Sequence, residues 1–97
     1  MHRFSIGREE DCDVVLHGAS VSRRHAYVTL RRDGSIQFED ANSTNGSYLV
    51  EGDNLVRISS TYLPPEACLQ LGQVRVLLAK ILQNILVKIR QDRGADS

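Results

Sequence analysis

The most constraining feature of this sequence is an alternating run that turns back on itself at an Asp-Gly pair. From Ala26 to Arg31, apolar residues alternate with polar or aromatic ones, as in a strand with one buried face. Asp33-Gly34 is a strong short hairpin signal, and residues 36–39 alternate again as the returning strand. We therefore predict a half-buried β-hairpin here.

Further short apolar stretches recur at intervals of roughly 8–12 residues, with turn residues between them. They cover residues 3–6, 14–16, 48–50, 55–58, 68–71 and 74–78. Pro64 and Pro65 exclude a central strand at their own position. This spacing indicates an all-β domain, an antiparallel sandwich or barrel, whose binding residues lie on loops at one end of the sheets.

The tail from Ala79 follows a different pattern. Its apolar residues recur at three- and four-residue steps, at Ile81, Leu82, Ile85, Leu86 and Ile89. This periodicity predicts an amphipathic helix that ends near residues 90–93, with an extra strand over residues 85–89 as the alternative. We expect the whole apolar stripe to be buried, in the same molecule or against a partner.

The length and the net charge of the chain limit the classes of protein to which it can belong. The 97 residues allow one domain with a modest core, and 12 basic side chains balance 12 acidic ones. A neutral chain lacks the long-range attraction of a general nucleic-acid or anionic-membrane binder. Residues 1–32 hold six arginines against four acids, so we expect any anion site in the first third.

The two cysteines, Cys12 and Cys68, do not have the spacing of metal ligands, so we expect no metal site. Sequence alone leaves a disulfide between them open. No signal-peptide pattern precedes the first strand, and no apolar run reaches the roughly 18–20 residues that cross a bilayer. Two reduced thiols in the cytoplasm are therefore the default expectation.

Strong hydrogen-bond donors gather before the strand that begins at Ala26. Ser22-Arg23-Arg24-His25 places a hydroxyl, two guanidiniums and an imidazole in consecutive positions. Such a cluster suits phosphate, which carries about −1.5 to −2 charge, because the planar fork of arginine matches its oxygens. Neighbours in an extended chain point to opposite sides, so we expect Arg24 to be a solvated or ion-paired surface residue.

Three motifs in register resemble a forkhead-associated (FHA) domain over residues 3–80. They are Phe4-Ser5-Ile6-Gly7-Arg8, Ser22-Arg23-Arg24-His25 and Asn42-Ser43-Thr44-Asn45-Gly46-Ser47. The resemblance implies an FHA/SMAD-like β-sandwich over residues 1–80, followed by a C-terminal extension over residues 81–97. It also implies a phosphothreonine-peptide reader in signalling or regulated assembly, with a phosphorylated protein as partner, no cofactor and no catalysis.

The same resemblance implies individual roles. Ser22 and Thr44 would bond phosphate oxygens, and Thr44 would do so through its hydroxyl or its backbone. Arg8 and Arg23 would contact phosphate or the peptide backbone, and Asn45 would hold the peptide main chain with its amide. Three further residues would support the site structurally, namely Gly7, His25 and Gly46.

Two alternatives belong to other classes. A hydrolase would use Ser22, His25 and Asp40 as nucleophile, base and orienter, but residues three apart in an extended chain lie about 10 Å from each other. A scaffold would keep the fold without phosphate binding. Its motivation is that only residues 1–6 precede Gly7, where the family has two more strands. An exposed edge strand or the C-terminal segment would then mediate homodimerisation.

Overall fold

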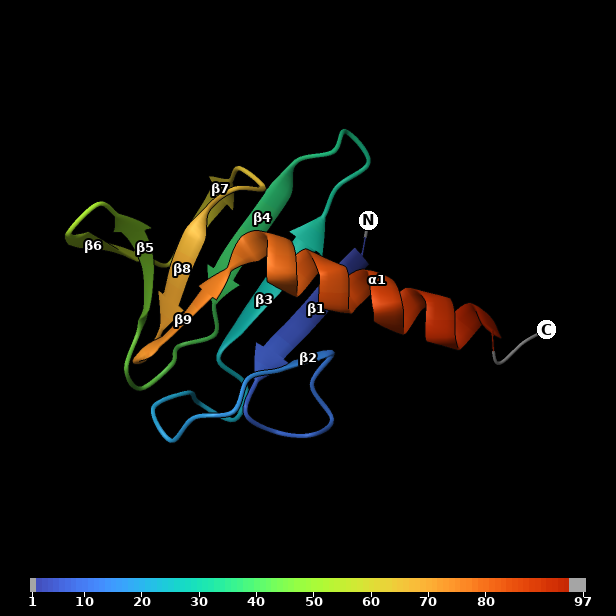
Figure 1. Cartoon of the computed structure of the whole chain (residues 1–97), viewed down its shortest axis with the longest axis horizontal. Coiled ribbons are helices and arrows are strands. Elements are labelled where there is room, and N and C mark those ends of the chain that lie inside the picture. The colour runs from blue at the N-terminus through green and yellow to red at the C-terminus, as the bar shows by residue number, and fades with distance from the viewer. Residues whose placement is uncertain (1, 95–97) are drawn as a thin grey trace.

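The computed structural model describes residues 2–94, within which nine strands precede one helix (Figure 1). The strands are β1 (His2–Gly7), β2 (Val14–Val15), β3 (Ala26–Leu30), β4 (Ile36–Asp40), β5 (Ser47–Glu51), β6 (Asn54–Ile58), β7 (Ser60–Leu63), β8 (Cys68–Leu71) and β9 (Val74–Leu77). The helix is α1 (Leu78–Gly94). Every predicted strand region is present, and β7 is additional.

The strands form two sheets that pack face to face. Sheet A has the order β2-β1-β3-β4-β7, and sheet B has the order β6-β5-β8-β9. All pairs are antiparallel except β1 and β2, which pair in parallel over two residues. In the predicted hairpin, Val28 on β3 lies opposite Phe38 on β4, and both are fully buried. The β-sandwich prediction is confirmed.

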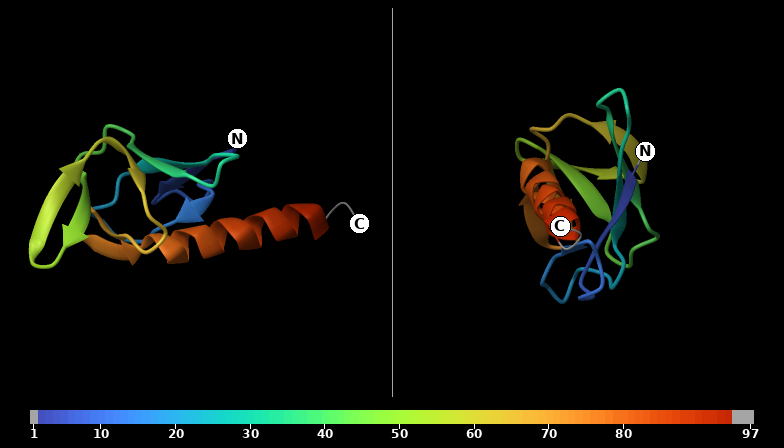
Figure 2. Two further views of the ribbon diagram at one scale, coloured as in Figure 1. Left: turned by 90° about the horizontal axis from the view of Figure 1, so that it is seen from above. Right: turned by 90° about the vertical axis from the view of Figure 1, so that its right-hand side faces the viewer.

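Helix α1 continues the second layer where sheet B ends at β9. It lies on the same side of sheet A as sheet B does and runs across β3 and β1 (Figures 1 and 2). Its buried side chains, Leu78, Ile81 and Ile85, join the core shared by the two sheets. The helix prediction is therefore confirmed and the alternative strand over residues 85–89 is wrong. No helix within residues 2–94 is long and apolar enough to cross a lipid bilayer.

The expectation that the whole apolar stripe is buried is wrong at one position. Leu86 is 53% exposed, whereas Ile85 is 0% exposed. Successive helical residues are rotated by about 100° around the axis, so a helix that turns Ile85 inward carries Leu86 toward its flank. Leu82 and Ile89 are partly buried against the core.

Strand β7 was not expected from the sequence. It pairs antiparallel with β4 at the edge of sheet A, with Phe38 opposite Thr61. Only Thr61 and Leu63 turn a side chain inward, so its apolar pattern is short. Pro64 follows directly, which is compatible with an edge strand because an edge strand leaves one side without ladder hydrogen bonds.

The carboxylate of Asp13 occupies one backbone donor on the edge of β1 that β2 leaves open. It accepts a hydrogen bond from the backbone N–H of Ser5 at 2.9 Å, while the Asp13 N–H donates to Ser5 Oγ at 3.0 Å. Its other oxygen lies 3.2 Å from Lys88 Nζ on α1. Burial alone would raise the pKa of Asp13, but the bonds from Ser5 and Lys88 outweigh it and the pKa is lowered.

Candidate functional site

Four connections gather at one end of the sandwich: the β1–β2, β2–β3 and β4–β5 loops and the β8–β9 turn (Figure 1). Hydrogen bonds link them directly. The Arg8 N–H donates to the Ser22 carbonyl at 3.1 Å, and the Gly72 N–H donates to the Gly46 carbonyl at 2.9 Å. The three sequence motifs, distant along the chain, are therefore neighbours in space.

Gly7 allows the first two loops to touch. A Cβ atom at this position would overlap the carbonyl oxygen of Arg23. The backbones on either side are bonded, since the His25 N–H donates to Ile6 O at 2.8 Å and the Glu9 N–H donates to Arg23 O at 3.3 Å. Any larger residue would force these strands apart, which removes Arg8 from its place beside the second loop.

His25 links the second loop to the third from inside the protein. Its side chain is fully buried. The backbone N–H of Ser22 donates to Nδ1 at 3.0 Å, so Nδ1 carries no proton and Nε2–H donates to the Gly46 carbonyl at 2.9 Å. Gly46 has φ +85°, which favours glycine. This geometry supports a scaffold role for both residues.

Asp40 organises the third loop, which begins where β4 ends. The hydroxyls of Ser43 and Ser47 each donate to Oδ1 at 2.6 Å, and the Ser43 N–H donates to Oδ2 at 2.9 Å. Burial raises the pKa of Asp40, yet the hydrogen bonds from Ser43 and Ser47 outweigh it, so the pKa lies below its ordinary value. The sequence predicted a structured loop over residues 40–46, but it did not identify Asp40 as the residue that organises this loop. The loop's wealth of Asp, Asn, Ser and Thr was the available signal.

Ser22 and Thr44 meet at the centre of the loop end. The Thr44 backbone N–H donates to Ser22 Oγ at 3.1 Å. An oxygen that accepts this bond keeps its own proton, so the Ser22 hydroxyl remains free to donate. Because the Thr44 N–H is already used, its hydroxyl is the group that remains for a ligand. The sequence left open whether the Thr44 hydroxyl or its backbone would bond phosphate, and the bond to Ser22 favours the hydroxyl.

Arg8 and Asn45 are exposed but held in place by one hydrogen bond each. Arg8 Nε donates to the Val21 carbonyl at 3.0 Å, which leaves its two terminal NH₂ groups for a ligand. Asn45 Nδ2 donates to the Ser20 carbonyl at 2.9 Å and keeps a second N–H and its carbonyl. Ser20 Oγ also accepts the Gln73 N–H at 2.8 Å. No sequence motif marked Ser20.

Arg23 and Arg24 are adjacent in sequence but differ in their contacts. Arg24 Nη2 lies 3.0 Å from Asp11 Oδ2 in an exposed ion pair. The Arg23 side chain is also exposed and makes no hydrogen bond or ion pair within residues 2–94. The guanidinium donors of Arg23 therefore remain available at the rim of the site.

The geometry does not form the hydrolase triad. Both ring nitrogens of His25 are occupied, by the Ser22 backbone and the Gly46 carbonyl, so neither can take a proton from Ser22 Oγ. Asp40 Oδ1 is 3.8 Å from Nε2, the nitrogen that already donates to Gly46. In the described part of the chain, no group of three or more His, Cys, Asp or Glu side chains is placed to hold a metal ion.

Comparison with known proteins adds independent evidence. The family model of the FHA domain matches residues 4–72. The glycogen accumulation regulator GarA of Mycolicibacterium smegmatis is 36% identical over 73 residues, which is 75% of this chain and 43% of GarA. The chain thus spans less than half the length of this curated relative.

Two solved structures share the fold at 27% identity. The FhaA FHA domain in complex with the intracellular domain of Rv3910 has a TM-score of 0.67 and covers 77% of each chain. The N-terminal FHA domain of S. cerevisiae Rad53p, in complex with a phosphothreonine peptide, has a TM-score of 0.60 and covers 73% of this chain and 56% of its own. Sequence and fold therefore point to the same family.

Proposed function

This chain belongs to the FHA domain family, and from that premise we propose that its loop end binds phosphothreonine peptides of partner proteins. One observation carries the proposal: donors from three loops remain free while hydrogen bonds fix their positions. A phosphorylated threonine presents three strong acceptor oxygens and about −1.5 to −2 charge, which such donors satisfy. Related FHA domains include the Rad53p domain in complex with a phosphothreonine peptide.

We assign each residue the contact that its free groups allow. The Arg8 guanidinium and the Ser22 hydroxyl bond the phosphate oxygens, and the Thr44 hydroxyl adds a third donor. Arg23 contributes positive charge from the rim. The Asn45 amide holds the peptide main chain, since it retains both a donor and an acceptor.

The energies of these contacts are sufficient for a reversible interaction. A charge-assisted hydrogen bond contributes about 1.5–3 kcal/mol. Micromolar binding corresponds to about −8 kcal/mol, so a few such contacts account for it. The loss of one anchor should weaken binding by roughly ten- to a hundredfold.

We propose that the module acts in signalling or regulated assembly, without turnover, cofactor, nucleic acid or membrane binding. The absence of turnover is supported by His25, whose two ring nitrogens are both engaged. A cytoplasmic location is supported by Cys12 and Cys68, which are free thiols, as expected of a reducing compartment.

A scaffold that does not bind phosphate is the weaker alternative. Helix α1 packs against the core of its own sandwich, with Ile81 and Ile85 fully buried. These side chains are therefore not available to a second copy unless the helix undocks.

Isothermal titration with phosphothreonine and unphosphorylated peptide libraries tests the proposal. We expect micromolar binding of the phosphorylated library, a ten- to hundredfold loss in Arg8→Ala, and no loss in Arg32→Ala. Arg32 is a matched control because it is exposed in the β3–β4 hairpin, at the opposite end of the sandwich. Equal binding of both libraries would overturn the proposal.

A further inference from the structure

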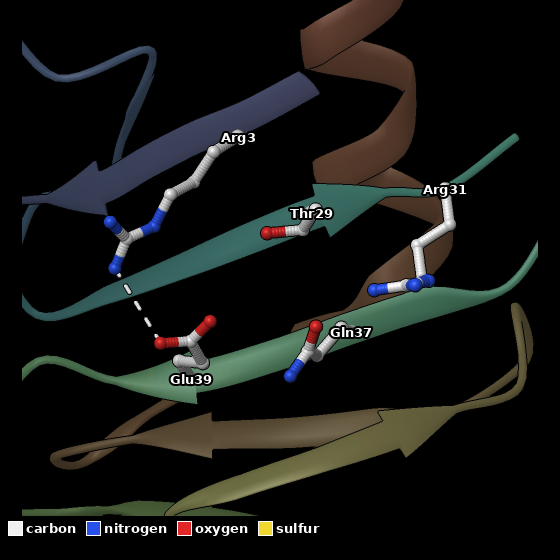
Figure 3. A pocket seen from close by; sticks show the side chains of 5 residues that line it. All are labelled: Arg3, Thr29, Arg31, Gln37 and Glu39. Carbon is white, nitrogen blue, oxygen red and sulfur yellow. Dashed lines mark ion pairs between the residues drawn. The ribbon is translucent and has the colours of Figure 1, made fainter. Parts of the chain in front are cut away.

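A hollow of about 320 Å³, lined by five polar residues, lies on the outer face of sheet A (Figure 3). The lining residues come from β1, β3, β4 and the position directly after β3. They are Arg3, Thr29, Arg31, Gln37 and Glu39. Neither the sequence motifs nor the proposed phosphopeptide site includes any of them. The hollow is therefore separate from the loop end.

Strand register explains why a hollow forms here. Arg3 is the cross-strand partner of Thr29, and Thr29 is the partner of Gln37. The three side chains form one row on the outer face, because direct partners point to the same side of a sheet. Thr29 is short and its two neighbours are long, so the row has a notch above the threonine.

The floor of this notch is a hydroxyl without a partner. Thr29 is only 7% exposed, and its hydroxyl makes no hydrogen bond to any group within residues 2–94. Figure 3 shows the hydroxyl among the side chains that line the hollow. No buried side-chain oxygen within residues 2–94 lacks a hydrogen-bond partner, so the Thr29 hydroxyl is reached by solvent through the hollow and can donate to a ligand there.

The walls carry more positive than negative charge. Arg3 Nη2 lies 3.5 Å from Glu39 Oε2, and the Arg3 guanidinium lies 3.9 Å from the centre of the Tyr27 ring. The Arg31 guanidinium has no ion-pair or hydrogen-bond partner in the described part of the chain. Two guanidiniums thus face one carboxylate, and hydrogen-bond donors outnumber acceptors.

We propose that this hollow binds a carboxylate side chain of a partner protein. The Arg31 guanidinium pairs with the carboxylate, and the Thr29 hydroxyl donates to it from the floor. The Arg3–Glu39 pair forms the side wall and keeps Arg3 in place. An acidic partner is favoured by charge complementarity, because the only acid of the hollow is already paired.

This site can be occupied together with the phosphopeptide site. Arg3 lies near the start of β1, whereas Arg8 follows the last residue of this strand, so the two arginines are at opposite ends of β1. A partner that carries both a phosphothreonine and an acidic surface would then engage two separate contacts. The hollow does not depend on whether the loop end binds phosphate.

The test is an NMR titration of the ¹⁵N-labelled chain with acetyl-Glu-Glu-amide as the probe and acetyl-Gln-Gln-amide as its uncharged analogue. We expect saturable millimolar shifts of the Thr29, Arg31 and Gln37 amides with the acidic peptide only. Arg31→Gln should weaken binding about tenfold and Thr29→Val severalfold. Arg57→Gln, an exposed arginine on the opposite sheet, should have no effect.

The proposal is overturned if the acidic peptide produces no saturable shift, if the Gln analogue binds equally well, or if Arg57→Gln weakens binding as much as Arg31→Gln. Shifts confined to Arg8 and Ser22 would also overturn it, because they would place the carboxylate at the loop end. Failure of the phosphopeptide titration would overturn the proposed function alone. Arg31→Gln should leave phosphopeptide affinity unchanged.

Discussion

The backbone N–H of Thr44 donates a hydrogen bond to the hydroxyl oxygen of Ser22, 3.1 Å away. The two residues are 22 positions apart in the sequence and belong to different loops. Their contact fixes the relative position of the second and third loops. It also leaves the Ser22 hydroxyl proton free to be donated to a ligand.

Replacement of Ser22 by alanine should weaken phosphopeptide binding by roughly ten- to a hundredfold. The variant loses the donor to phosphate and the acceptor for the Thr44 N–H, while the buried core is untouched. Isothermal titration measures the affinity, and urea denaturation checks that the fold persists. Ser60→Ala, an exposed serine on β7, should bind as the wild type does. Unchanged affinity in Ser22→Ala would remove this residue from the site.

Affinity for a phosphothreonine peptide should fall as the pH is lowered from about 7 to 5. The second ionisation of the phosphate has a pKa near 6, so the dianion is lost over this range. Asp40 stays charged throughout, because its pKa lies below its ordinary value. Fluorescence anisotropy across the range gives the profile. A flat profile would show that ligand charge is not recognised.

Replacement of Asp40 by asparagine should lower the free energy of unfolding at pH 7 by about 1–3 kcal/mol. The carboxylate accepts bonds from Ser43 and Ser47, and its pKa is lower in the folded state. Its contribution is therefore present above about pH 4 and is lost as the pH falls through the lower folded pKa. Urea denaturation at pH 7 and pH 3 should show the gap between wild type and variant shrinking in acid. A gap that is independent of pH would contradict this account.

Replacement of Ile85 by alanine should cost about 2–5 kcal/mol, because its side chain is fully buried between α1 and the sheets. Leu86→Ala is the matched control on the next residue, which is 53% exposed, and it should cost less than about 1 kcal/mol. Urea denaturation measures both values. Equal costs would show that α1 does not dock on the sandwich as described.

Local patterns in the sequence predicted most of the fold. The Asp33-Gly34 turn and the alternation around it defined β3 and β4, and the spacing of Ile81 and Ile85 defined the buried face of α1. Strand β7 was not predicted from the sequence because it is a short edge strand directly before Pro64. A strand at the edge of a sheet needs few buried apolar residues. The evidence for β7 therefore lies in its pairing with β4 and not in its own residues.

The candidate site was predicted less completely than the fold. Its sequence motifs identify the residues that face a ligand, but not the residues that hold them in place by hydrogen bonds. The role of Ser20 depends on its contacts with Asn45 and Gln73, which are made only in the folded chain. The role of Asp40 depends in the same way on its contacts with Ser43 and Ser47. The hollow around Thr29 likewise depends on which residues β1 and β4 place beside it. Such relationships arise from register and loop packing, which no local stretch encodes.

The bond between Asp13 and the Ser5 N–H has a consequence for the behaviour of this chain at high concentration. An unoccupied donor on an edge strand invites the growth of a sheet from molecule to molecule. Here an incoming strand would first have to expel a carboxylate and break its contact with Lys88. Pairing of another chain with β1 at Ser5 therefore carries a cost that a bare strand edge would not impose.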